Sequence, residues 1–191
     1  MMHAIRMHIT RRLDGRVRRL WAWAGSVALI AAAVVAGPAA VPARAAQGDL
    51  ACAAQFTMAM SPALKPNGSA SVNVTASLSS CTSANGNYAR LQSATATASG
   101  TATADGAGKG PCGVLFTAQG TGTITWSDKS TSTIQFTVNT DPTNGTVTFH
   151  CVITGGTLSN DGDTVVPVIS GAQCTSGGLQ SMSAHMAVDF A

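Results

Sequence analysis

Residues 120–139 read GTGTITWSDKSTSTIQFTVN and carry the strongest pattern in the chain. Ile124 and Trp126 alternate with small polar residues before the polar stretch SDKS, and the alternation resumes beyond it at Ile134, Phe136 and Val138. Successive side chains of a strand point to opposite faces, so each arm has one apolar face. This pattern predicts a β-hairpin, and the other strands of the domain are expected to pair with it or to pack across from it.

The length of the hairpin loop follows from the need to put both apolar sets on the same side. A four-residue loop would place Ile124 opposite Thr133 and separate the two sets, whereas a three-residue loop places Ile124 opposite Ser132 and keeps them together. The last residue of such a loop commonly adopts a left-handed conformation, in which glycine is the least strained residue. The predicted turn residues are Ser127, Asp128 and Lys129, with Lys129 in the left-handed position.

The first 45 residues have the organisation of a secretory signal peptide. Six arginines precede an apolar run at 21–37, and prolines and the small-residue motif Ala43-Arg44-Ala45 follow it. This pattern predicts cleavage after Ala45 and a secreted, extracellular protein. The alternative is a retained membrane anchor, since the apolar run lies at the short end of the spanning range. Two arginine pairs leave both the general secretory and the twin-arginine export routes open.

Removal of this leader reverses the net charge. Residues 46–191 contain four basic residues and seven aspartates, so the predicted mature chain carries 4 − 7 = −3. No basic patch remains to neutralise a phosphate backbone, which excludes nucleic acid as a partner. Contact with a membrane is expected only through the leader before cleavage.

The mature chain is long enough for one domain and is rich in Thr, Ser, Ala and Gly. It shows no sustained helical periodicity, but many short alternating segments lie between turn signals. We therefore expect an all-β domain at 46–191, an Ig-like two-sheet β-sandwich of about eight or nine strands, with a β-barrel as the alternative.

Five cysteines in an exported chain imply two disulfides and one free thiol, which fifteen arrangements would satisfy. Cys151 lies on the apolar face of its expected strand, where a buried thiol behaves as a small hydrophobe. We propose that it stays reduced, and that Cys52 pairs with Cys81 and Cys112 with Cys174.

The cysteine placement and the ITWSD core of the hairpin together resemble a family of small secreted actinobacterial proteins of unassigned function. The resemblance covers most of residues 50–190. Lys129 stands where that family tends to have glycine, and Cys151 is an addition to a four-cysteine pattern. The family offers no catalytic residues that could be carried over to this chain.

No catalytic, cofactor-binding or metal-ligating set of residues is expected in this sequence. His150 and His185 are both expected to face outward, and they lack metal-ligand spacing. Asp161 and Asp163 lie in SNDGD, which lacks the acidic residue that closes a calcium loop, so a solvated loop is expected. The favoured function is a non-catalytic extracellular module that binds an envelope polymer, a surface or a protein. The alternative is a small secreted hydrolase that uses His150 or His185 with an aspartate.

Overall fold

The computed structural model describes residues 48–191. The predicted signal peptide, its cleavage site after Ala45 and the alternative membrane anchor lie outside these residues. Within the described range, no helix has the length and apolar character that crossing a membrane would require.

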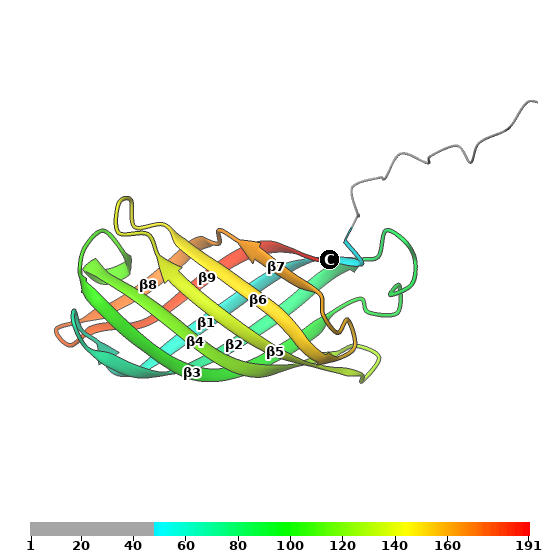
Figure 1. Ribbon diagram of the computed structural model, residues 1–191, viewed down its shortest axis with the longest axis horizontal. Coiled ribbons are helices and arrows are strands. Elements are labelled where there is room, and N and C mark those ends of the chain that lie inside the picture. Colours follow the sequence, from blue (N-terminus) through cyan, green and yellow to red (C-terminus); the bar gives the residue numbers. More distant parts are fainter. Residues whose placement is uncertain (1–47) are drawn as a thin grey trace, which may run out of the picture. The chain divides into compact units, whose positions relative to one another are not determined.

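The described chain consists of nine antiparallel strands and one short 3-10 turn, which confirms the predicted all-β class. Neighbouring strands along the chain pair as a meander from β1 to β7, while β9 pairs with β1 and β8 pairs with β9 (Figure 1). The order across the sheet is β7-β6-β5-β4-β3-β2-β1-β9-β8. The elements are β1 (Leu50–Leu64), β2 (Ser69–Thr82), β3 (Ala94–Ala107), η1 (Pro111–Gly113), β4 (Val114–Trp126), β5 (Thr131–Thr140), β6 (Val147–Gly156), β7 (Gly162–Val165), β8 (Val168–Thr175) and β9 (Gly178–Phe190).

The expected two-sheet sandwich is not confirmed, because all nine strands belong to one hydrogen-bonded sheet. This sheet curls into a half-barrel (Figure 1). At one end, edge strand β7 reaches β9: the amide of Gly162 donates to the carbonyl of Ala191 at 3.3 Å, and the amide of Asp189 donates to Asp163 Oδ2 at 2.7 Å. A single sheet can thus enclose its own core, so a second sheet is not needed to cover it.

Glycines in β3 and β4 permit the strands to approach closely within this curl. Gly100 pairs with Gly120, and a Cβ built on Gly120 would lie 2.2 Å from the Ser99 carbonyl oxygen. The aromatic edge of Phe136, which is opposite Gly120 in β5, occupies the space on the inner side. Glycines that let backbones pack tightly are a usual device for bending a sheet.

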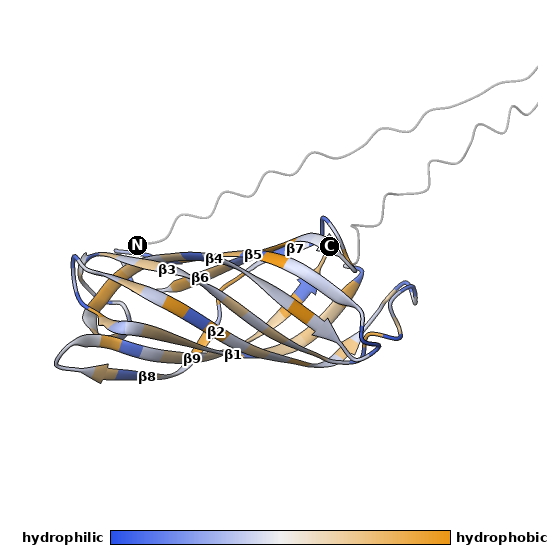
Figure 2. Cartoon of the chain, turned by 90° about the horizontal axis from the view of Figure 1, so that it is seen from below, coloured by the Kyte–Doolittle hydropathy of each residue, from blue (hydrophilic) through white to orange (hydrophobic). Residues whose placement is uncertain are grey.

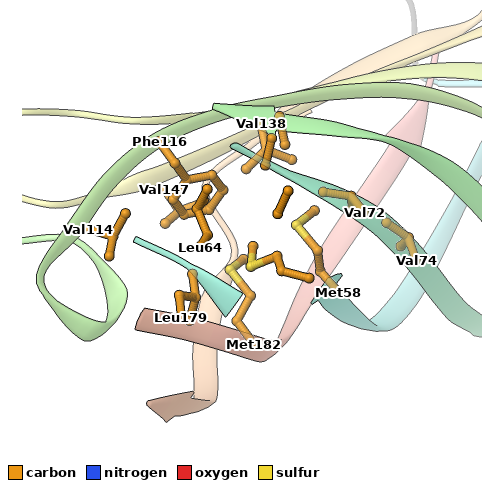
Figure 3. Close-up of a cluster of buried hydrophobic side chains, with 14 of the residues drawn as sticks. Met58, Leu64, Val72, Val74, Val114, Phe116, Val138, Val147, Leu179 and Met182 are labelled. Carbon is orange, nitrogen blue, oxygen red and sulfur yellow. The ribbon is translucent and has the colours of Figure 1, made fainter. Parts of the chain in front are cut away.

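The inner face of the curled sheet forms the core. Apolar and polar residues alternate along most strands, as the hydropathy colouring shows (Figure 2). In one buried cluster, side chains from β4, β5 and β6 point toward side chains from β1 and β9 (Figure 3). Phe149 packs against this cluster and against a second one around Trp126. Its ring stacks on Phe56 and Phe136, with centroids 5.5 and 6.3 Å apart.

The hairpin of β4 and β5 has the register derived from its sequence. Ile124 lies opposite Ser132. Two hydrogen bonds close the three-residue loop: the amide of Trp126 donates to the carbonyl of Ser130, and the amide of Lys129 donates to the carbonyl of Trp126. Lys129 has φ 72°, the left-handed conformation expected for that position. Trp126 is buried, and its Nε1 donates to Ser132 Oγ at 2.8 Å.

The disulfides join the same cysteines that the sequence analysis pairs. Cys52 and Cys81 connect β1 and β2, with Cα atoms 4.1 Å apart. Cys112 and Cys174 connect η1 to β8, with Cα atoms 5.5 Å apart. Cys151 is buried without a disulfide. Two disulfides indicate folding in an oxidising environment, which agrees with the predicted export, while secretion itself stays a prediction.

Candidate functional site: the outer face of the sheet

The outer face of the half-barrel carries threonines aligned across neighbouring strands. One row, here called the threonine row, runs across β1 to β5, and each member lies directly opposite the next. All of its members are exposed. It consists of Thr57, Thr75, Thr97, Thr123 and Thr133. Adjacent strands are about 4.8 Å apart and successive outward positions about 7 Å apart, so hydroxyls and methyl groups form a regular array.

Strands β1 to β5 contain one charged residue, Asp105, which lies near the end of β3. Charged residues make up about a quarter of an average soluble domain. The aromatic residues of these strands all face the core. The outer face of β1 to β5 is therefore nearly free of charge and carries mainly hydroxyl and amide groups.

Two hollows of this outer face have linings without charged side chains, whereas a third, over the start of β1 and the end of β9, is lined in part by Asp163 and Asp189. The first, the glycine hollow, has a volume of about 400 Å³ and lies over Gly100 and Gly120, with Thr101, Gln119 and Thr137 around it. The second, the β9 hollow, has a volume of about 550 Å³ and lies over β2, β1, β9 and β8. Its polar lining includes Gln55, Thr57, Ser77, Ser170, Ser183 and His185. Neither lining contains a charged Asp, Glu, Lys or Arg side chain.

The two histidines considered for a hydrolase lie on the outer face of different strands. His150 Nδ1 is 2.6 Å from Thr164 Oγ1. His185 lines the β9 hollow. Within residues 48–191, no hydrogen bond or ion pair joins either histidine to an aspartate. The geometry therefore gives no support to a histidine and aspartate pair that could activate a water or a hydroxyl nucleophile.

Several aspartates lie near the end of the domain where β1 begins and β9 ends. Burial, and secondarily the charge of Asp49, raises the pKa of Asp161 above its ordinary value. Asp161 Oδ2 is buried and has no hydrogen-bond partner among the described residues. Asp163 instead accepts from the amides of Thr164 and Asp189. No group of three or more metal-binding side chains occurs within residues 48–191.

The contacts of the predicted turn residues and the burial of the free thiol indicate structural roles. Asp128 Oδ2 is 2.7 Å from Arg90 Nε, and hydrogen bonds from the side chain and then the backbone of Ser130 lower the pKa of Asp128. Ser127 Oγ donates to the carbonyl of Arg90. Burial raises the pKa of Cys151 to about 12, so its thiol is protonated and unreactive at neutral pH.

The threonine row is not recognisable as a site from the sequence alone. The strands β3, β4 and β5 contain Thr-x-Thr, whereas β1 and β2 do not, and the alignment depends on the register of all five strands. The available signal was the lack of charge in the same segments.

No protein-family description, curated protein or solved structure matches the chain. The resemblance to secreted proteins with an ITWSD hairpin therefore stays a prediction.

Proposed function

We propose that the domain is a non-catalytic extracellular module whose outer face binds an uncharged, hydroxyl-rich polymer, such as a neutral glycan of a cell envelope. The observation that carries this proposal is the threonine row, which crosses five strands without an intervening charge. Hydroxyl groups both donate and accept hydrogen bonds, so such an array matches the hydroxyls of a neutral sugar chain.

The chemistry of the face favours this class of partner over others. An anionic polymer would require arginines or lysines, and strands β1 to β5 contain neither. Protein interfaces are enriched in aromatic residues, methionine and arginine at their centre, and β1 to β5 bury their aromatic residues and expose no arginine. A neutral hydroxylated partner uses the groups that are present.

The rigidity of the face would help binding. Threonine is branched at Cβ and has restricted χ1 rotation, so it loses less conformational entropy on contact than a long flexible side chain. Each hydrogen bond between the polymer and this face replaces a hydrogen bond to water, so it contributes only modestly to the free energy of binding. We therefore expect weak contacts that sum along a polymer through several simultaneous attachments.

Retention of the purified, disulfide-bonded protein on insoluble polysaccharides tests this proposal. We expect retention on neutral polysaccharides that high salt does not release. A variant with Thr97→Lys and Thr123→Lys places two charges at the centre of the threonine row and should lose retention. Ala84→Lys adds a charge in an exposed turn and serves as the control.

Two outcomes would contradict the proposal. Retention restricted to anionic polymers and released by salt would show that the outer face is not the binding surface. Equal retention of Ala84→Lys and the double threonine variant would lead to the same conclusion.

A further inference from the structure

The β9 hollow combines polar residues from two neighbouring rows of the outer face. In the first row, Gln55 lies opposite both His185 and Ser77. In the second row, Thr57 lies opposite Ser183, and their hydroxyl oxygens are 3.0 Å apart. Hydroxyl, amide and imidazole groups from β2, β1 and β9 thus surround one volume.

A β-bulge in β8 adds a wall to this hollow. The register between β8 and β9 shifts between Ile169 and Gly171, which makes Ser170 the extra residue. Ser170 is exposed and lines the hollow, while Ile169 packs against the core. Bulges redirect side chains and are common beside functional sites. The β8 edge therefore supplies a hydroxyl that a regular strand pairing would not place there.

The lining retains unused hydrogen-bonding capacity. Within residues 48–191, the side chains of Gln55, Ser77 and His185 form no hydrogen bond to other protein groups. A glutamine amide has two donors and an acceptor, and a neutral imidazole has one of each. Neighbouring hydroxyls, amides and carbonyls of this kind recognise the vicinal hydroxyls of a sugar, whereas an ion would require opposite charge.

We propose that the β9 hollow is the subsite for one neutral sugar residue of the polymer, with Gln55, Ser77 and His185 as its hydrogen-bonding groups and Ser170 as its wall. The inference rests on the proposed function and places the binding of one sugar residue in the β9 hollow. The volume of about 550 Å³ lies within the range of small-molecule sites, roughly 300 to 1,000 Å³. The lining of the glycine hollow contains no histidine, and the pairings of β3 with β4 and of β4 with β5 are regular where it lies, which distinguishes the two hollows.

Nuclear magnetic resonance titration of the isotope-labelled protein tests this inference. The probes are soluble neutral oligosaccharides of glucose, mannose and N-acetylglucosamine, with an oligogalacturonate as the charged comparison. At least one neutral probe should shift the amide resonances of Gln55, Ser77 and His185. The double variant Gln55→Ala with His185→Ala should weaken its binding at least tenfold.

A matched control lies outside both hollows. Gln92→Ala with His150→Ala removes the same two residue types at exposed positions that line neither hollow, and this variant should bind the probe as the unaltered protein does. All four side chains are exposed, so melting temperatures should change little and both variants should remain folded.

The outcomes separate this inference from the proposed function. If the protein is retained on a polymer but no amide resonance of the β9 hollow shifts, the inference is overturned and the proposed function stands. Equal losses of affinity in the two double variants would have the same meaning. Binding of the oligogalacturonate alone would overturn the neutral-sugar assignment. Shifts in the hollow without retention on any insoluble polymer would support the subsite and contradict the proposed function.

Discussion

The inner and outer faces of strands β1 to β5 are built from the same segments but follow different rules. Inner residues range in size from glycine to tryptophan, and their sizes complement one another across neighbouring strands. For example, the ring of Phe136 fills the space beside its partner Gly120. Outer positions are mostly Thr, Ser, Asn and Gln. The high β-propensity of threonine explains part of this composition, but it does not explain the near absence of charge. Packing therefore determines which residues occupy the inner face. The uniform composition of the outer face needs another explanation, and we propose that this explanation is ligand binding.

The largest expected effect comes from emptying the inner face at Trp126. Trp126→Ala should lower the free energy of unfolding by about 3 to 5 kcal/mol, because it removes a fully buried ring and its edge-to-face contact with Phe190. Thr125→Ala changes the neighbouring outer residue and should cost less than about 0.5 kcal/mol. Urea denaturation measures both. Similar losses for the two variants would contradict the division between the faces.

The second prediction compares Cys151 with its outward neighbour His150. Burial, and then the charge of Asp163, raises the pKa of Cys151 from 9.0 to about 12. A thiol with a raised folded-state pKa contributes stability that is complete below about pH 9 and is lost as the pH rises toward 12. The unaltered protein should lose roughly 3 kcal/mol by pH 11 relative to its stability at pH 8.

Cys151→Ala should lack this fall, whereas His150→Ala should retain it. Urea denaturation between pH 8 and 11 gives the comparison, with disulfide integrity checked at each pH. Rapid alkylation of Cys151 in the folded protein at pH 8 would show that the thiol is accessible and would contradict the prediction.

The third prediction concerns Ser132, a buried polar residue of the inner face. Ser132→Ala leaves the indole of Trp126 and the carbonyl of Thr157 without their hydrogen-bond partner, which should cost about 1 to 3 kcal/mol. Thr133→Ala on the outer face should cost less than about 0.5 kcal/mol. Thermal unfolding of both variants checks the difference. Equal melting temperatures would indicate that water replaces the lost bonds.

The smallest expected effect lies in the turn, which belongs to neither face. Lys129→Gly should stabilise the domain by roughly 1 kcal/mol, since Lys129 adopts φ 72° and glycine is not strained there. Lys129→Ala removes the same charge but retains the Cβ, so it should give no such gain. A lower melting temperature for the glycine variant would contradict this explanation.

Local residues were sufficient to predict the hairpin and the free thiol. The alternation around Trp126 allowed a single loop length that keeps both apolar sets together, and the structure has that register. The apolar position of Cys151 set it apart from the other four cysteines, and it lies buried without a disulfide. In both cases a short segment contains the whole physical constraint, because burial of one face fixes the register.

The two-sheet arrangement could not be decided in that way. Strands with one apolar face alternate identically whether they pack against a second sheet or curl around their own core. The pairing of β1 with β9 and the approach of β7 to β9 settle the matter, and both join residues distant in the chain.

The sequence by itself determined the all-β class, the hairpin turn at Lys129 and the scarcity of charged residues within 48–191. Only the tertiary structure decided that the sheet is single, that five threonines share one row and that Ser170 lines the β9 hollow. The physical reason is the range of the interactions. Alternation and turn geometry act over a few residues, whereas a row or a hollow exists only once separate strands have taken a register relative to one another.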